Sequence, residues 1–215
     1  MAEATYLAGL EDVWRSGRLI FRAIQAEDYE FFFNHLDTDP INLTLATPMT
    51  LRPTRKKKAE EWFEDWKKHD YLADVMICLR LDVESNKEYF SGDAASCDEP
   101  KPIGMLTLAP GVYGRDARNR ACNLGVSIAS PYQNKGLGTE AVTWALDWAF
   151  RRVNMHSVHL GSIEYNKRAH KCYQKCGFKY DGRRRQCHFH DRKWYDLYVF
   201  SIIEDEWEEM RKGAQ

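Results

Sequence analysis

The residues of most obvious chemical interest lie in one glycine-containing turn, residues 131–141, with the sequence PYQNKGLGTEA. A short apolar run at residues 124–128 precedes the turn and predicts a strand that ends before Pro131. A run with a period of 3.6 residues follows and predicts a helix. One face of that helix comprises Leu137, Ala141, Trp144, Ala145, Trp148 and Arg152. Backbone amides at a helix N-terminus attract anions, and glycine lets a ligand approach them closely. We therefore interpret the turn as a phosphate-binding loop.

Two better-known glycine-rich phosphate loops do not fit the spacing. Lys135 precedes both glycines and no Gly-Lys-Ser/Thr follows them, which excludes a Walker loop. A third glycine is missing, and residues 153–156 contain no carboxylate for a ribose, which excludes a dinucleotide fingerprint. A glycine turn with a purely structural role remains the alternative.

Two further motifs complete a pattern that resembles the GNAT acetyltransferase superfamily. Gln133-x-x-Gly136-x-Gly138 is similar to that family's Gln/Arg-x-x-Gly-x-Gly/Ala signature. Residues 166–178, NKRAHKCYQKCGF, resemble its Asn-x-x-Ala-x-x-x-Tyr-x-x-x-Gly-Phe helix. A weaker echo at residues 194–207 resembles the closing strand of the branch that contains ribosomal-protein and spermidine N-acetyltransferases. The resemblance is strong over residues 118–207 and faint over residues 18–28.

The resemblance implies acetyl-CoA as co-substrate and places it on three segments. The backbone of Val126, Ser127 and Ile128 would pair with the pantetheine arm, and one N–H group there would polarise the thioester carbonyl. On a later helix, Asn166 would fix the pantetheine amide and Arg168 would add to the same site. The pyrophosphate would be held by Gln133, Asn134, Lys135, Gly136, Leu137, Gly138 and Thr139.

The resemblance also implies Tyr173 as the general acid, because its hydroxyl is protonated at neutral pH and can supply a proton to the departing thiolate. The general base is less clear. We name Glu164, at the end of the strand before the helix, and keep His156 and His159 as alternatives. A covalent acetyl-cysteine route is the rival mechanism, but the sequence shows no activating partner for its candidate nucleophiles, Cys172 and Cys176.

Composition limits the classes of partner. Thirty-one basic and 32 acidic residues leave a formal net charge of −1, so we expect no nucleic-acid partner. No apolar run approaches the ~20 residues that cross a bilayer, and residues 1–5 resemble no secretory signal. We therefore expect no membrane partner, a cytoplasmic or nucleocytoplasmic location, and reduced thiols at the six cysteines. We expect no metal ion; the alternative is a zinc site, without ordinary zinc spacing, at Cys172, Cys176, Cys187, His188 and His190.

The elements that must position these residues follow from hydrophobic periodicity. Strands are predicted at residues 18–24, 73–83, 103–109, 121–128 and 158–163, with two more near the C-terminus. A helix is predicted at residues 29–36, and a second opens at Pro53 with a core-facing set of Ala59, Trp62, Phe63 and Trp66. Residues 84–101 are rich in polar and turn residues and predict a mobile surface loop.

In the resembled family, the region between these two helices forms one wall of the acceptor pocket. Five acidic residues near it are candidates to hold a cationic amine: Glu27, Asp28, Glu30, Asp37 and Asp39. The alternative is that Asp28 and Glu30 are favourable charges in the first turn of a helix. Arg183 and Arg185 fall on one face of a late strand, where they would repel a polyamine unless they stay solvated.

The sequence thus predicts one domain over residues 1–215, with a core at 17–207 and peripheral tails at 1–16 and 208–215. The resemblance implies an α/β (α+β) fold, a mixed, mostly antiparallel sheet of about seven strands splayed at the coenzyme site, with helices on both faces. It implies acetyl-CoA-dependent N-acetylation of a small amine, a polyamine or a protein N-terminus by direct attack in a ternary complex, in a monomer or homodimer. The alternative is a non-catalytic acyl-CoA-binding sensor or scaffold; Tyr173 in its intact motif favours the enzyme.

Overall fold

The structure, a computed structural model, describes residues 10–46, 51–90, 100–111 and 117–213. Seven strands form one sheet in the order β1-β2-β3-β4-β5-β7-β6, and all neighbours are antiparallel except β4 and β5. The strands are β1 (Leu19–Ala23), β2 (Ala73–Leu79), β3 (Lys101–Pro110), β4 (Ala121–Ile128), β5 (Ser157–Ile163), β6 (Lys179–His190) and β7 (Lys193–Ile203). The sheet agrees with the predicted mixed, mostly antiparallel arrangement.

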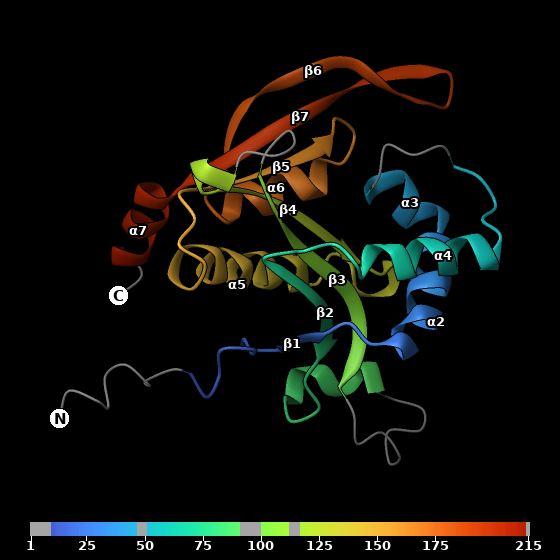
Figure 1. The fold of residues 1–215 in the computed structure, drawn as a ribbon, viewed down its shortest axis with the longest axis horizontal. Helices are drawn as coiled ribbons and strands as arrows, with labels where there is room; N and C mark the ends of the chain where they lie inside the picture. Colours follow the sequence, from blue (N-terminus) through green and yellow to red (C-terminus); the bar gives the residue numbers. More distant parts are fainter. Residues whose placement is uncertain (1–9, 47–50, 91–99, 112–116, 214–215) are drawn as a thin grey trace.

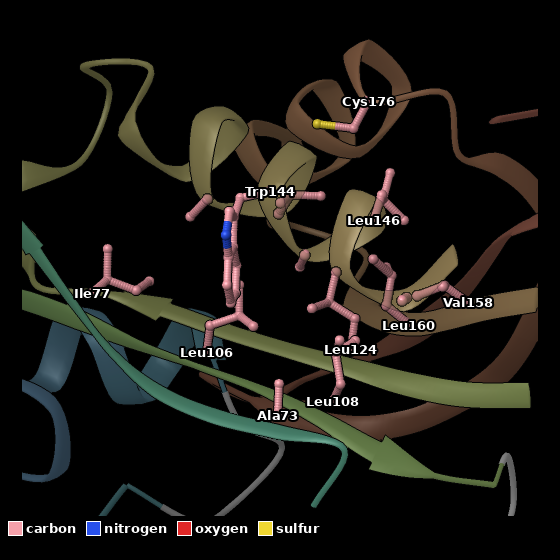
Figure 2. Close-up of a cluster of buried hydrophobic side chains, with 14 of the residues drawn as sticks. Ala73, Ile77, Leu106, Leu108, Leu124, Trp144, Leu146, Val158, Leu160 and Cys176 are labelled. Carbon is pink, nitrogen blue, oxygen red and sulfur yellow. The ribbon is translucent and has the colours of Figure 1, made fainter. Parts of the chain in front are cut away.

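Helices cover both faces of the sheet. On one face, α5 (Leu137–Arg151) and α6 (Lys167–Lys175) bury an apolar cluster against the strands, with Trp207 of α7 (Glu204–Lys212) at its margin. Figure 2 shows Trp144 and Leu146 of α5 above Leu106, Leu108 and Leu124 of the sheet. The opposite face carries a second cluster under α2 (Tyr29–Phe32) and α4 (Lys56–Trp66). In Figure 1, α2, α3 and α4 gather on one side of the molecule and α7 lies on the other.

The region between α2 and α4 differs from the prediction. In place of one helix over residues 29–36, the chain forms η1 (Ala26–Asp28), α2 and a π-helical turn, η2 (Phe33–Asp37). An unpredicted helix follows, α3 (Pro40–Ala46). A carboxylate oxygen of Asp39 accepts the N–H of Ile41 at 2.9 Å, and Pro40 occupies the first helical position. This is an ordinary start signal for a helix.

Two other predictions need correction. Trp62, expected to face the core, is 47% exposed and stacks on the rim of the second cluster against Phe32, whereas Ala59 and Phe63 are buried as expected. The predicted loop at 84–101 begins as a 3-10 helix, η3 (Glu84–Phe90), and the buried Asn86 amide ties it to the backbone carbonyls of Arg18 and Arg80. Residues 91–99 of that loop, and most of the predicted N-terminal tail, lie outside the described residues.

The sheet opens between its two parallel strands. β4 and β5 pair over only three positions, from Ala121 with Ser157 to Asn123 with His159. Beyond these pairs, residues 124–128 of β4 keep their pairing with β3 but have no partner on the β5 side. Backbone N–H and C=O groups along this stretch are therefore available to a ligand. Among the described residues, no helix is long and apolar enough to cross a membrane.

Candidate active site

The predicted phosphate loop lies where β4 ends and α5 begins. After a short 3-10 turn, η6 (Ser130–Tyr132), the backbone turns through Asn134 and Gly136, which have φ angles of 62° and 79°. Gly136 is the N-cap of α5 and provides no side-chain cap. The first N–H groups of any helix have no intrahelical acceptor, and those of α5 have no N-cap side chain as acceptor either. They also lie at the positive end of the helix dipole. Such a terminus suits an anion such as a pyrophosphate.

The surroundings of Gly138 indicate that the loop leaves space for a ligand. A Cβ atom built at this position would meet no protein atom nearer than Ile128 Cγ1, at 3.9 Å. Packing within the protein therefore does not require glycine here. Because Gly138 lines the cavity, a side chain would instead fill the space in front of the helix amides. The loop thus fits the phosphate-bearing group that the sequence predicts.

A cavity of about 350 Å³ runs from this loop into the opening between β4 and β5. Its walls come from β4, the loop, β5, α6 and α3. The structure brings together in this lining most of the predicted site residues: Val126, Ser127, Ile128, Gln133, Asn134, Gly136, Gly138, Thr139, Asn166, Arg168 and Tyr173. Three predicted residues do not line it. Leu137 is buried in the core, the Lys135 ammonium lies 4.3 Å from the ring centroid of Tyr89, and Glu164 lies beside β7.

Gln133 connects the two sides of the cavity. Its Nε2 donates to the carbonyl of Ile128 at 2.8 Å, and its Oε1 accepts from Arg168 of α6 at 3.0 Å. One side chain thereby ties the end of β4 to the helix beyond the opening. Arg168 lies on a cationic stripe of α6 with Lys171 and Lys175, two lining residues that the sequence analysis missed. Their spacing of three and four residues would have placed them on the same helix face.

Asn166 has two structural contacts beside its place in the lining. Its Oδ1 caps α6 by accepting the N–H of Ala169 at 3.2 Å, and its Nδ2 donates to the carbonyl of Leu45 at 3.0 Å. The second contact reaches the C-terminal turn of α3, where backbone carbonyls have no intrahelical donor. Asn166 thus holds α3 at the cavity as well as capping its own helix.

A second set of polar contacts fixes α3 in the same way. The Tyr165 hydroxyl donates to the carbonyl of Thr44 at 2.7 Å and lies 3.0 Å from Nε2 of His188. Since the hydroxyl has one proton, Nε2 of His188 is the donor of that second bond. Asn42, buried in α3, accepts a hydrogen bond from the Ser127 hydroxyl at 2.9 Å. The sequence analysis missed Asn42, because α3 itself was not predicted.

Tyr173 lies in the wall of the cavity with only 9% of its surface exposed. Its ring packs against Phe178 and Phe200, at centroid distances of 5.9 and 6.1 Å. Burial, and next the nearby thiols of Cys172 and Cys176, raise the pKa of the Tyr173 hydroxyl well above its usual range. The hydroxyl is therefore protonated at neutral pH, as a proton donor must be.

The predicted general base is less well placed. A carboxylate oxygen of Glu164 accepts the backbone N–H of Asp196 at 3.1 Å, directly beyond the last paired positions of β5 and β7. His159 faces Ser157, with 2.9 Å between Nε2 and Oγ, and burial lowers the pKa of its imidazole. None of the three predicted base candidates, Glu164, His156 and His159, lines the cavity.

The charged residues proposed for substrate contact are largely paired within the chain. The Asp28 carboxylate accepts hydrogen bonds from Nη1 and Nη2 of Arg22, each at 2.7 Å, and Lys56 pairs with Glu30. Arg183 pairs with Asp196 at 2.9 Å. Asp39 accepts from Ser130, whereas Oδ2 of Asp37 is buried without a hydrogen-bond partner among the described residues. No cluster of three or more candidate metal-binding side chains occurs within this described part.

Comparisons with known proteins bear on this site. The family model described as "Acetyltransferase (GNAT) domain" matches residues 18–179. The [ribosomal protein uS5]-alanine N-acetyltransferase of Escherichia coli is 29% identical over 110 residues, which are 51% of this chain and 55% of that protein. The chain thus spans about half the length of this curated relative. The spermidine N(1)-acetyltransferase of Vibrio cholerae is 26% identical over 147 residues, 68% of this chain and 80% of that protein.

A solved structure resembles the fold. The spermidine N-acetyltransferase of Vibrio cholerae, crystallised in complex with CoA and spermine, superposes with a TM-score of 0.69 at 20% identity. The superposition covers 90% of this chain and 99% of that one. This likeness confirms the predicted fold class.

Proposed function

The chain belongs to the GNAT acetyltransferase family, and from this premise we propose that it transfers an acetyl group from acetyl-CoA to a primary amine. The observation that carries the proposal is the opening between β4 and β5. The cavity in this opening is lined by the helix N-terminus at Gly136, which has no side-chain cap, and by Tyr173. A phosphate-bearing thioester fits such a passage, because one end binds anions and the other contains a proton donor.

The residues divide the work as follows. The first-turn amides of α5 would hold the pyrophosphate, with Arg168, Lys171 and Lys175 adding positive charge from α6. The unpaired backbone of residues 124–128 would bind the pantetheine arm and polarise the thioester carbonyl, as preorganised N–H groups do in oxyanion holes. Tyr173 would protonate the thiolate that leaves after the amine attacks directly in a ternary complex.

The amine must lose its protons before and during attack. Because Glu164 does not line the cavity, we propose that a neutral amine enters and that its remaining proton passes to water. The acceptor class is open between a small amine, a polyamine and a protein N-terminus. The named activities of the two relatives, on a ribosomal-protein alanine and on spermidine, support the last two.

The test is acetyl-CoA turnover, followed by thiol release, against polyamines, amino acids, aryl amines and N-terminal peptides. We expect one class to be acetylated, and Tyr173→Phe to lower kcat ~100-fold, the scale for loss of a general acid. Tyr180→Phe is the matched control, since Tyr180 lies on β6 with half its surface exposed. Unchanged turnover in Tyr173→Phe would remove Tyr173 from the mechanism.

The second candidate function is a non-catalytic acyl-CoA sensor or scaffold, favoured by the absence of a carboxylate or imidazole side chain from the described lining of the cavity. Tight acetyl-CoA binding without acetylation of any acceptor would establish it in place of the enzyme. A cytoplasmic location, a single domain and a monomeric or homodimeric state stay predictions.

A further inference from the structure

Two cysteines of α6 meet the first turn of α5 at the wall of the cavity. The Sγ atom of Cys172 lies 3.3 Å from the Thr139 hydroxyl. The Sγ atom of Cys176, one helical turn later, lies 3.6 Å from the Thr139 carbonyl oxygen and 3.8 Å from the Thr143 hydroxyl. The two thiols thus converge on Thr139, a residue of the predicted pyrophosphate loop.

The two thiols differ in access. Cys172 is half-buried and lines the cavity, whereas Cys176 is only 3% exposed and belongs to the apolar core. Of the other described cysteines, Cys78 and Cys122 are fully buried, and Cys187 is exposed on β6 outside the cavity lining. Cys172 is therefore the described thiol that a small molecule in the coenzyme cavity can reach.

The surroundings of Cys172 favour its thiolate. Hydrogen bonding to the neighbouring Cys176 thiol, the largest cause, lowers the pKa of the Cys172 thiol below its ordinary value, and the Thr139 hydroxyl and the charge of Lys175 act in the same direction against burial. Burial alone raises the pKa of Cys122 to about 12. Thiolate is the reactive form of cysteine, so Cys172 combines access with surroundings that favour the reactive form.

We propose that Cys172 is a thiol-modification site at which a low-molecular-weight disulfide forms a mixed disulfide that blocks the acetyl-CoA cavity. The Cys172 thiolate attacks one sulfur of the small disulfide, a new S–S bond forms to that sulfur, and the other half leaves as a thiolate that takes a proton from solvent. Cys172 is oxidised and half of the small disulfide is reduced. The blocking role rests on the proposed function, because it requires acetyl-CoA in this cavity.

Cys176 acts in this site as a hydrogen-bond donor and does not form a disulfide with Cys172. Residues four apart on a helix have Cβ atoms ~5–6 Å apart, whereas a disulfide needs ~3.8 Å. Closing that gap would distort the last turn of α6, which carries Tyr173. Nor does the location suit acyl transfer, since Thr139 belongs to the phosphate end of the cavity and the thioester is assigned to residues 126–128.

The first measurement is the rate of iodoacetamide alkylation against pH, resolved by peptide mapping. We expect a midpoint for Cys172 clearly below the ~8.5 of a free cysteine. Cys176→Ala, which removes the donor, should raise that midpoint by about one pH unit. A midpoint at or above ~8.5 in the unmodified protein, or no change in Cys176→Ala, would overturn the assignment of an activated thiol.

The second measurement tests the link to the cavity. Acetyl-CoA has no free thiol, and at ten times its Kd it should slow alkylation of Cys172 about tenfold while leaving Cys187 unaffected. After treatment with glutathione disulfide, we expect one adduct at Cys172 and at least a tenfold weaker affinity for acetyl-CoA by calorimetry, both reversed by dithiothreitol. In Cys172→Ser, the affinity should be the same before and after treatment.

The outcomes separate this inference from the proposed function. If acetyl-CoA fails to bind the untreated protein, the proposed function fails, and the blocking role fails with it even if Cys172 reacts. If acetyl-CoA binds but Cys172 is inert, or reacts equally fast with the cavity filled, the modification site alone is rejected.

Discussion

The two regions that border the cavity are built by different means. The first, residues 121–151, comprises β4, the phosphate loop and α5, and we call it the cradle segment. The second comprises η1, α2, η2, α3 and α4, which lie within residues 26–46 and 51–66, and we call it the wall segment. The cradle segment offers backbone amides whose direction is set by one strand, one turn and one long helix. The wall segment offers side chains on short helices.

The difference lies in what fixes each region. The anion site of the cradle segment is formed by consecutive residues, Gly136 and the helix that follows, and Arg18 holds it from a distance through the Lys135 carbonyl and Glu140. The helix α3 of the wall segment has seven residues, too few to be stable alone. It depends on Tyr165 and Asn166, each 121 residues distant in sequence, and on Ser127. An anion site formed by consecutive residues thus faces a wall whose short helix is held from a distance.

The largest expected effect breaks the cradle segment at Gly138. Gly138→Val should fill the space before the helix amides and weaken acetyl-CoA binding at least ~100-fold, or about 2.8 kcal/mol, by calorimetry. The free energy of unfolding should not fall, because the protein leaves room for a side chain and valine is no worse than glycine within a helix.

Gly182→Val is the matched control for Gly138. Position 182 lies on β6, where an added Cβ would meet no atom within 4 Å, so the same side chain enters open space. Its affinity for acetyl-CoA should equal that of the unmodified protein. Equal affinity in Gly138→Val as well would show that the ligand does not approach this helix terminus.

An intermediate effect is expected where the two regions are tied together, at Asn166. Asn166→Ala removes the cap of α6 and the donor to Leu45, and should lower the free energy of unfolding by about 2 kcal/mol in urea. Asn166→Asp keeps an acceptor for the cap and loses only the donor, so it should cost about 1 kcal/mol. Both variants should raise the KM for the amine acceptor more than the Kd for acetyl-CoA.

Equal losses of stability in the two Asn166 variants would contradict this division. They would mean that the helix cap contributes nothing and that the tie to α3 carries the whole effect. A larger effect on acetyl-CoA than on the acceptor would instead assign Asn166 mainly to the coenzyme, as the sequence predicts.

The same contrast explains what could be predicted from sequence. The strand, turn and helix around Gly136 were predictable because each has a local signal: an apolar run, paired glycines and a 3.6-residue period. Tyr173 and Asn166 followed from a compact helix motif. In the wall segment, the α2–η2 break depends on packing of Phe32 and Leu36 under α4, which no short window contains. The start of α3 at Asp39-Pro40 was a local signal that the analysis passed over.

Contacts between distant residues account for the remaining differences. The sequence placed Glu164 after a strand and before the helix, and nothing local indicated that the backbone of Asp196 would occupy its carboxylate. Of the groups that lower the pKa of Cys172, Cys176 is only four residues away, but Thr139 lies 33 residues away on α5. Side-chain contacts between residues distant in sequence were thus the part that sequence reasoning could not supply.

The smallest expected effect concerns Asp74 of β2, the strand on which the helices of the wall segment pack. Asp74 lies two and four positions before Met76 and Cys78 on β2. Because every second residue of a strand points to the same face, its side chain lies on the face of the cluster under α2 and α4, to which both belong. One of its carboxylate oxygens is buried without a hydrogen-bond partner among the described residues. Burial raises the pKa of Asp74 to about 6 from an ordinary value of 3.8.

The sign of the pH dependence follows from these two values. Between pH 3.8 and about 6, the folded chain keeps a proton that the unfolded chain has lost, so stability falls as the pH rises through this range and stays lower above it. Asp74→Asn removes the ionisation and should stabilise the protein by about 1 kcal/mol at pH 7.5, after allowance for solvent screening of a partly exposed group.

Urea unfolding of both proteins at pH 4, 6 and 7.5 measures the effect. The gain in Asp74→Asn should vanish at pH 4, where the aspartate is protonated in the folded state. Asp70→Asn, at an exposed position before β2, controls for the change in net charge. A gain of equal size at all three pH values would show that the steric fit of the residue 74 side chain, and not its buried charge, limits the packing of the wall segment on β2.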